Sequence, residues 1–93
     1  MRLTFEWHES KAEANLVKHG VCFEEARTVF NDPSAISIAD PDHSLAEERY
    51  IAVVISSRWR LLTVSYTERE HSIRIITARK ATTHERANYE NDQ

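Results

Sequence analysis

The fold is decided by residues 49–78, which read RYIAVVISSRWRLLTVSYTEREHSIRIITA. Apolar and polar residues alternate along this stretch with a period of two, which is typical of half-buried β-strands. Short polar linkers interrupt the alternation, so the stretch predicts consecutive antiparallel strands. The strands predicted within this stretch are RYIAVVIS (49–56), RLLTVSYT (60–67) and HSIRIITA (71–78). The segment AISIA (35–39), which precedes the stretch, predicts a fourth strand of the same meander.

Helical patterns lie on both sides of these strands. Residues 9–18 are rich in strong helix formers and are followed by Gly20, the only glycine of the chain and the expected stop of this helix. Residues 23–30 place apolar side chains at helical spacing. Residues 82–90 predict a last helix, because Thr82 and Glu85 have the spacing of a capping box.

The opening segment LTFEW (3–7) predicts a further short strand, at the edge of the sheet or as a lid. The order of elements predicts an α+β domain, with the two N-terminal helices on one face of an antiparallel meander and a third, C-terminal helix. Because side chains alternate along a strand, Leu62, Val64 and Tyr66 are expected on one face. The opposite face is expected to carry Thr63, Ser65 and Thr67, and Arg74 is expected to join these hydroxyls. In the last strand, one face is expected to carry Ile73, Ile75 and Thr77, and the other face Arg74, Ile76 and Ala78.

Composition indicates one domain over residues 1–93. The net charge is -3, but it is unevenly distributed: residues 1–57 contain five Lys/Arg and ten Asp/Glu, whereas residues 58–86 contain seven and three. A cationic surface is therefore compatible with an acidic chain. A single cysteine and the absence of a long apolar run predict a cytoplasmic protein without a disulfide or membrane span.

Three cations lie close together at the end of the last predicted strand: Arg74, Arg79 and Lys80. Arginine pairs bind phosphate by bidentate hydrogen bonds, so this cluster is the strongest candidate for a phosphate site. Positions 74 and 79 have opposite parity, and they converge only if the strand bends. The alternative is that these arginines form ion pairs with the carboxylates of the N-terminal half.

Other patterns give weaker hypotheses. The DPDH segment (40–43) is more typical of a turn than of a metal site, because no second ligand cluster completes it. Trp59 lies in a predicted turn between two arginines, where it is either an exposed platform for a base or partner, or a partly covered turn residue. No glycine-rich phosphate loop is present, and no cofactor is predicted.

Several motifs, in this order, resemble those of the BrnT family of toxins from bacterial type II toxin-antitoxin modules. They are FEW (5–7), KAEANLVKHGVCFEEARTVFNDP (11–33), EERYIAV (47–53), RLLTVSYTER (60–69) and IRIITARKATTHERANYE (73–90). The resemblance implies a RelE-like fold and a ribonuclease that inhibits translation. It also implies neutralisation by a BrnA antitoxin with a ribbon-helix-helix region, in a heterotetramer that reaches DNA only through the antitoxin.

The chain departs from the family pattern at His8, Val54, Trp59 and Thr77. An acidic residue is common at the first of these positions, glycines are frequent at the next two, and serine is usual at the last. These differences affect turns and helix starts more than the cationic cluster.

RNA supplies its own nucleophile, the 2′-hydroxyl, so such a ribonuclease needs a base, an acid and cations around the phosphate, but no metal. Arg74 and Arg79 are assigned to the phosphate, and Lys18, Lys80 and Arg49 to RNA binding. The candidates for proton transfer are His19, Glu48 and Tyr66. Two alternatives are a catalytically silent module in a DNA-bound repressor complex and a plain RNA-binding module.

Overall fold

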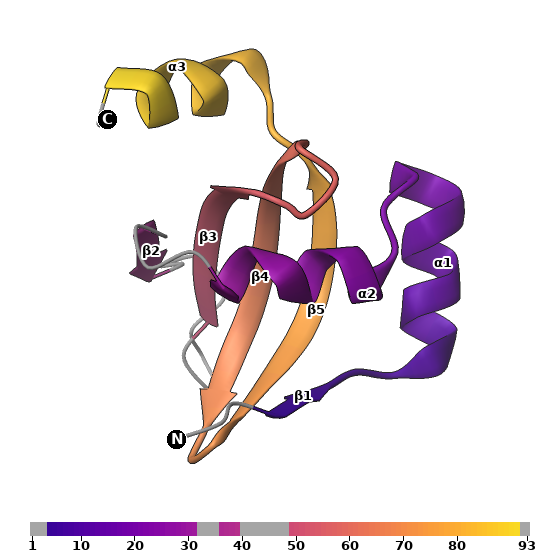
Figure 1. Cartoon of the computed structure of the whole chain (residues 1–93). Helices are drawn as coiled ribbons and strands as arrows, with labels where there is room; N and C mark the ends of the chain where they lie inside the picture. Colours follow the sequence, from indigo (N-terminus) through magenta and orange to yellow (C-terminus); the bar gives the residue numbers. More distant parts are fainter. Residues whose placement is uncertain (1–3, 32–35, 40–48, 92–93) are drawn as a thin grey trace.

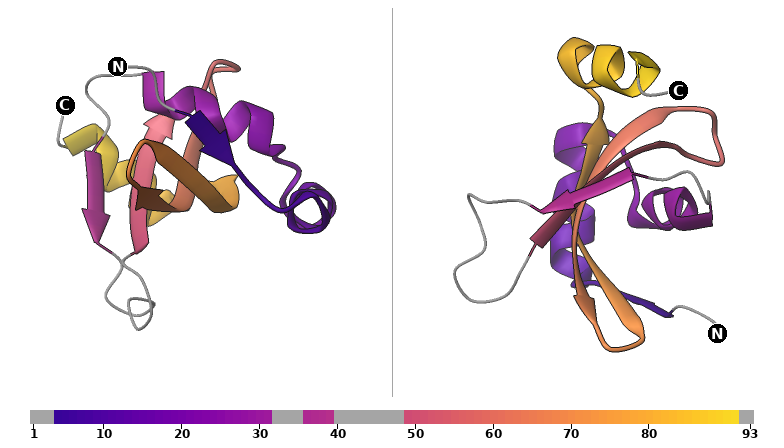
Figure 2. Two further views of the ribbon diagram at one scale, coloured as in Figure 1. Left: turned by 90° about the horizontal axis from the view of Figure 1, so that it is seen from below. Right: turned by 90° about the vertical axis from the view of Figure 1, so that its left-hand side faces the viewer.

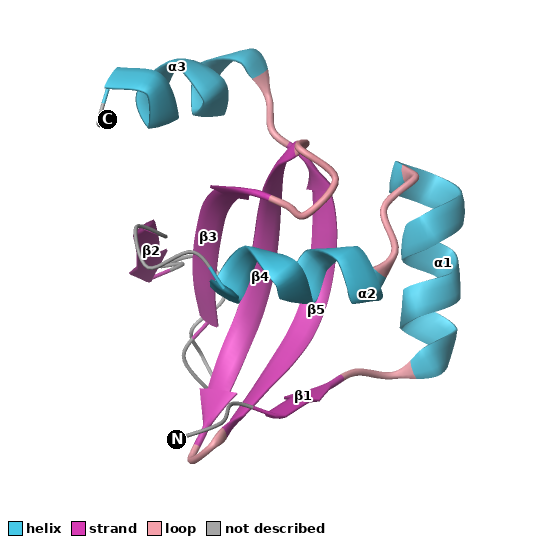
Figure 3. Cartoon of the chain, viewed as in Figure 1, coloured by secondary structure: helices cyan, strands magenta, loops and turns pink. Residues whose placement is uncertain are grey.

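A computed structural model describes residues 4–31, 36–39 and 49–91, which form one mixed sheet and three α-helices (Figures 1 and 3). None of the described helices is long and apolar enough to cross a membrane. The elements in chain order are β1 (Thr4–Glu6), α1 (Glu9–His19), α2 (Phe23–Ala26), the 3-10 helix η1 (Arg27–Asn31), β2 (Ile36–Ala39), β3 (Arg49–Ile55), β4 (Leu61–Arg69), β5 (Ser72–Lys80) and α3 (Thr83–Asn91).

The sheet contains five strands in the order β1-β5-β4-β3-β2. Strands β2 to β5 pair antiparallel with their neighbours, which confirms the predicted meander and the α+β class. The short opening strand lies at the edge, where β1 pairs parallel with β5. One edge of the sheet therefore joins the N-terminal segment to the last strand.

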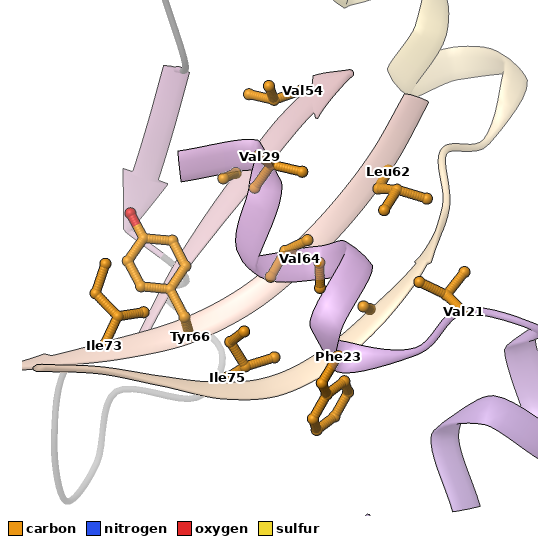
Figure 4. Close-up of a cluster of buried hydrophobic side chains, with 12 residues drawn as sticks. Val21, Phe23, Val29, Val54, Leu62, Val64, Tyr66, Ile73 and Ile75 are labelled. Atoms are coloured by element: carbon orange, nitrogen blue, oxygen red, sulfur yellow. The ribbon is translucent and has the colours of Figure 1, made fainter. Parts of the chain in front are cut away.

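One face of the sheet packs against α2 and η1 and forms the core (Figure 4). The predicted face of β4 is confirmed, since Leu62, Val64 and Tyr66 are buried there. Aromatic contacts close the core at the β1 end: the ring centroids of Phe5 and Phe30 are 5.5 Å apart, and those of Trp7 and Phe23 are 5.8 Å apart. We call the opposite side of the sheet the second face.

Helix α1 lies beside the sheet, along β5, while α2 and η1 cover the core face (Figures 1 and 2). Strand β1 ends at Glu6, opposite Arg74, so beyond that point this edge of β5 has no strand partner among the described residues. The Asn15 amide of α1 serves this edge: it donates to the Ala78 carbonyl (2.8 Å) and accepts from the Ala78 N–H (3.2 Å). It also donates to the Val21 carbonyl (2.9 Å). Asn15 is 6% exposed and joins α1 to the sheet.

The predicted stop of the first helix and the predicted start of the last are confirmed, whereas the helix predicted over 23–30 is α-helical only to Ala26 and continues as the 3-10 helix η1. Gly20 follows α1 with φ +71° and donates its N–H to the Leu16 carbonyl (2.9 Å), a conformation that costs residues with a Cβ about 1 kcal/mol or more. At α3 the capping box is formed: the Glu85 N–H donates to Thr82 Oγ1 (3.1 Å) and the Thr82 N–H to Glu85 Oε1 (2.9 Å).

A β-bulge in β5 changes which residues share a face. Ser65 of β4 pairs with Thr77, but the next residue, Tyr66, pairs with Ile75, so Ile76 is an extra residue in the ladder. An extra residue reverses the alternation beyond it. The predicted faces of Thr77 and Ala78 were therefore wrong: Ala78 belongs to the core, and Thr77 is exposed.

Candidate functional site

Three polar side chains form a row across adjacent strands on the second face. Thr67 of β4 pairs directly with Arg49 of β3 on one side and with Arg74 of β5 on the other. Directly paired residues project from the same face, and neighbouring strands lie about 4.8 Å apart, so the two arginine backbones are about 10 Å apart with Thr67 between them. Two long cationic side chains can therefore reach one ligand placed over Thr67.

The Thr67 hydroxyl has no hydrogen-bond partner in the part of the chain that the structure describes, although the residue is only 1% exposed. A buried hydroxyl without a partner costs about 1–3 kcal/mol, so such groups call for an explanation. A hydroxyl can donate to a phosphate oxygen, as can the guanidinium groups on either side. The row therefore has the donors of an anion site.

Arg74 also faces a carboxylate from β1. Glu6 pairs with Arg74 in the parallel ladder, and its Oε1 lies 3.7 Å from Arg74 Nε. The two side chains are 42% and 30% exposed, and an ion pair of this kind contributes little to stability. Arg74 therefore keeps donors for a ligand, with a carboxylate beside it that can accept a proton.

The bulge also brings Arg79 to the second face, where Arg79 pairs with Thr63 of β4. Both of its terminal nitrogens are bound to Glu85 of α3: Nη1 donates to Oε1 (2.8 Å) and Nη2 to Oε2 (2.9 Å). Thr63 Oγ1 donates to Oε1 as well (2.9 Å). The Arg79 guanidinium, more than the hydrogen bonds from Thr82 and Thr63, lowers the pKa of Glu85 to about 2 against opposing burial. Arg79 is thus bound in a structural ion pair.

Arg74 and Arg79 project from the same face of the sheet, which is the condition for both to contact one phosphate. They nevertheless lie in different rows of paired residues. Their partners on β4, Thr67 and Thr63, are four residues apart, which corresponds to about 13 Å along the strand. The other arginine in the row of Arg74 is Arg49, which lies on the far side of Thr67. The geometry therefore pairs Arg74 with Arg49 over one ligand, and Arg79 with Glu85.

A shallow cleft of about 260 Å³ adjoins this surface at the bulge. Thr77, the next β5 residue after Arg74 on the second face, borders the cleft, as does the extra residue Ile76. The α1 side of the cleft carries the cations Lys11 and Lys18 and the imidazole of His19. Two of the predicted residues, Lys18 and His19, therefore lie together at the edge of the sheet.

Residues 7–85 match the family model described as "Ribonuclease toxin, BrnT, of type II toxin-antitoxin system". The chain belongs to the BrnT family. This confirms the family that the sequence motifs indicated.

A structural comparison supports the BrnT fold. The crystal structure of the Brucella abortus ribonuclease toxin BrnT superposes with a TM-score of 0.66, at 20% sequence identity, over 88% of this chain and 100% of that chain. A search of curated protein sequences finds no match.

The residues predicted for proton transfer in a BrnT ribonuclease lie in different places. Tyr66 is 3% exposed and lies in the core, on the face opposite Arg74, with its ring 4.8 Å from that of Phe30. Glu48 and the DPDH segment lie outside the described residues. Within the described ranges, no three His, Cys, Asp or Glu residues are grouped for a metal ion.

The remaining predicted residues divide between the row and its surroundings. Arg49 forms one end of the row, and Lys80 is exposed at the end of β5. Glu6 and Thr67, which the structure places beside Arg74, were not among the site residues predicted from the sequence. Glu6 could not be recognised because the sequence does not reveal the register of β1 against β5. Thr67 could have been recognised, because the sequence already predicted that it shares a sheet face with Arg74 on the neighbouring strand.

Proposed function

We propose that this BrnT-family chain is a metal-independent endoribonuclease that binds the phosphate of the cleaved bond over the Arg49–Thr67–Arg74 row. The observation that carries the proposal is the buried Thr67 hydroxyl, which has no partner among the described residues and is flanked in register by two arginines. Two guanidinium groups that flank a hydroxyl in the same row offer donors that suit the oxygens of a phosphodiester. They suit its transition state better, because negative charge accumulates on those oxygens as the nucleophile adds.

Cleavage in this scheme is an internal transfer. The 2′-hydroxyl oxygen attacks the adjacent phosphorus while its proton passes to a base, the bond from phosphorus to the 5′-oxygen breaks, and that oxygen takes up a proton. The products are a 2′,3′-cyclic phosphate and a free 5′-hydroxyl. Glu6, next to Arg74, is the described carboxylate best placed to act as the base. His19, in the adjoining cleft, is the candidate for the acid.

The lysines around the row extend the surface along which RNA can lie. Lys11 and Lys18 line the cleft at the bulge, and Lys80 is exposed at the end of β5. Contacts of this kind neutralise phosphates without reading bases, and their contribution falls with salt. They therefore serve general attraction, while the arginine row serves the reaction.

The toxin-antitoxin family implies an antitoxin partner. We propose a BrnA-type ribbon-helix-helix antitoxin that covers the cationic face, in a cytoplasmic heterotetramer that contacts DNA only through the antitoxin. Free toxin then inhibits translation by cutting RNA. The competing function is a silent module that acts only within a repressor complex.

The test is incubation of the purified chain with a long single-stranded RNA in excess chelator, beside an Arg74→Ala variant. We expect wild type to cleave and the variant to be about 10²–10³-fold slower, the usual effect of removing a donor to a developing oxyanion. Arg86→Ala is the matched control, since Arg86 is an exposed arginine of α3 outside the row. Equal rates in wild type and Arg74→Ala would exclude the row as the site, and intact RNA in all samples, with or without ribosomes, would favour the silent module.

A further inference from the structure

The turn between β3 and β4 (residues 56–60) is built around one buried serine. The Ser56 N–H donates to the Arg60 carbonyl (2.8 Å), and the Trp59 N–H donates to the Ser56 carbonyl (2.9 Å). Ser56 Oγ donates to Glu25 (2.6 Å), which also binds Arg60, so the turn is fixed to α2. The Ser57 N–H donates to Thr28 Oγ1 (2.9 Å). This turn is a rigid element.

Trp59 is held in an unusual state on this turn. Its φ is +63°, in the left-handed region that bulky residues rarely adopt, and the residue is 86% exposed. Both features oppose folding, because the backbone is strained and a large apolar ring remains in water. A residue kept in such a state by a rigid scaffold indicates a role for the exposed ring.

A cleft of about 380 Å³ opens beside the ring. Tyr89 of α3 contributes a second aromatic side chain, and Figure 2 shows the turn extending from the sheet between α3 and α2. The other lining residues are mostly small and polar: Thr28, Asn31, Ile55, Ser56 and Ser57. Two aromatic rings beside the Asn31 amide and the Ser57 hydroxyl match a flat heteroaromatic ring with hydrogen-bonding edges, which is the chemistry of a nucleobase.

The charge and the position of the cleft favour RNA as the occupant. Arg58, next to Trp59, is exposed, and the segment that contains the turn carries seven Lys/Arg against three Asp/Glu. The cleft lies on the η1 side of the sheet and the arginine row on the second face. The turn is next to Leu61, at the end of the sheet where an RNA strand can pass from one side to the other, and it is six β4 residues, or about 20 Å along the strand, from Thr67. Single-stranded sites on small domains commonly cover four or more nucleotides, so one strand can reach both places.

We propose that the cleft between Trp59 and Tyr89 binds an unpaired base of the RNA strand whose phosphate occupies the arginine row. This inference rests on the proposed function and adds a second contact that selects single-stranded RNA and positions the cleaved bond. Stacking on Trp59 supplies most of the attraction, and Arg58 binds the neighbouring phosphate.

The test measures binding of a fluorescently labelled single-stranded 2′-O-methyl RNA, which lacks the nucleophile and is not cleaved. Trp59→Gly is the main variant, since glycine relieves the positive φ and the protein should melt at or above the wild-type temperature. We expect its affinity to fall about 5- to 100-fold, the usual effect of losing one stacked base. Trp59→Phe should recover part of the loss. Val17→Ala, at an 89% exposed apolar residue of α1, is the matched control and should bind as wild type does.

A second probe separates stacking from charge. The same oligonucleotide with abasic positions throughout should bind wild type and Trp59→Gly equally, because it offers phosphates but no bases. Unchanged affinity of Trp59→Gly for the intact probe would overturn the inference, and so would weakened binding only of a coexpressed antitoxin, which would make Trp59 a protein contact. Neither result touches the proposed function, which depends on the Arg74→Ala cleavage assay.

Discussion

Arg74 and Arg79 lie on the same strand and project from the same face, yet their surroundings differ. Arg79 is bound by both terminal nitrogens to Glu85, at 2.8 and 2.9 Å. Arg74 has a looser carboxylate partner at 3.7 Å, with Arg49 and the unpartnered Thr67 hydroxyl beside it. Residue type and sequence proximity do not distinguish an arginine that is fully bound in an ion pair from one that keeps donors for a ligand. The number and geometry of the hydrogen bonds do.

The origin of each partner explains the difference. Glu85 lies six residues after Arg79, on the first turn of α3, where the capping box already holds its side chain. Glu6 comes from the opposite end of the chain, on a short edge strand with 42% of its side chain exposed. A local and already ordered partner loses less entropy on pairing, so the Arg79 pair is the stronger one.

The largest expected effect on stability follows from breaking the Arg79 pair. Arg79→Ala leaves a partly buried carboxylate without its main partner and should lower the free energy of unfolding by about 2 kcal/mol. Arg74→Ala should lower it by less than about 0.5 kcal/mol, because its ion pair is exposed. Urea titrations of both variants measure this. A greater loss of stability in the Arg74 variant would reverse the comparison.

The same pair of variants sharpens the assignment of activity. At a temperature where both variants are folded, the RNA cleavage rate of Arg79→Ala should be within a few-fold of the wild-type rate. The rate of Arg74→Ala should be about 10²–10³-fold lower. Comparable losses of rate in the two variants would return Arg79 to the catalytic site.

Acid should weaken the Arg79 end of the sheet. Glu85 has a pKa of about 2 in the folded chain against an ordinary value of 4.5, so the unfolded state binds its proton first. Its contribution is fully present above about pH 4.5 and is lost as the pH falls toward 2. Urea midpoints measured across this range should fall more steeply for wild type than for Glu85→Gln. Parallel pH profiles in the two proteins would contradict the depressed pKa.

Two threonines on one strand should respond in opposite ways. Thr67→Val removes a buried hydroxyl that has no partner in the described part of the chain. It should raise the free energy of unfolding by about 1 kcal/mol, while it slows RNA cleavage. Thr63→Val removes the hydrogen bond to Glu85 and should lower the free energy of unfolding by about 1 kcal/mol. Thermal unfolding and single-turnover cleavage measure the two effects. A Thr67→Val variant that is less stable and fully active would show that this hydroxyl serves the fold.

The smallest expected effect is at Lys80, an exposed cation next to Arg79. Lys80→Gln should reduce the slope of log affinity for single-stranded RNA against log salt by about 0.7, the value for one released counterion. It should leave the bound cleavage rate unchanged. A titration from low to moderate salt tests this, and an unchanged slope would place Lys80 outside the RNA path.

The order of the elements, the stop of α1 and the start of α3 could be predicted from the sequence because they depend on local interactions, whereas the change from α-helix to 3-10 helix after Ala26 was not predicted. Gly20 stops α1 in the left-handed conformation that glycine adopts most easily, and Thr82 and Glu85 form the capping box that their spacing predicts. The meander follows from alternation and short turns, which give each strand its neighbour.

The bulge at Ile76 shows where local patterns stop being sufficient. Nothing in IRIITARK distinguishes a straight strand from one with an extra residue, because both retain the same β-branched composition. The bulge nevertheless moves Ala78 into the core and places Arg79 on the face of Arg74. Pairing between strands decides this outcome, and pairing depends on residues that are distant in the sequence.

The candidate site was predicted in its residue types and not in its arrangement. Arg49 and Arg74 were identified, but their meeting across Thr67 depends on the registers of two ladders. Tyr66 was proposed for proton transfer from its chemistry alone, and its face of β4 places it against Phe30 in the core. Face and register, more than residue identity, separate a reactive side chain from a packing one.

Asn15 has a consequence for association between molecules. An uncovered strand edge offers N–H and carbonyl groups to any other extended chain, and proteins with such edges tend to aggregate. The Asn15 amide occupies both backbone groups of Ala78, where β1 no longer protects β5. One side chain on a helix therefore occupies the backbone groups to which another strand would bind. This protects the part of β5 beyond β1 from pairing with a second molecule and so from nucleating fibrils.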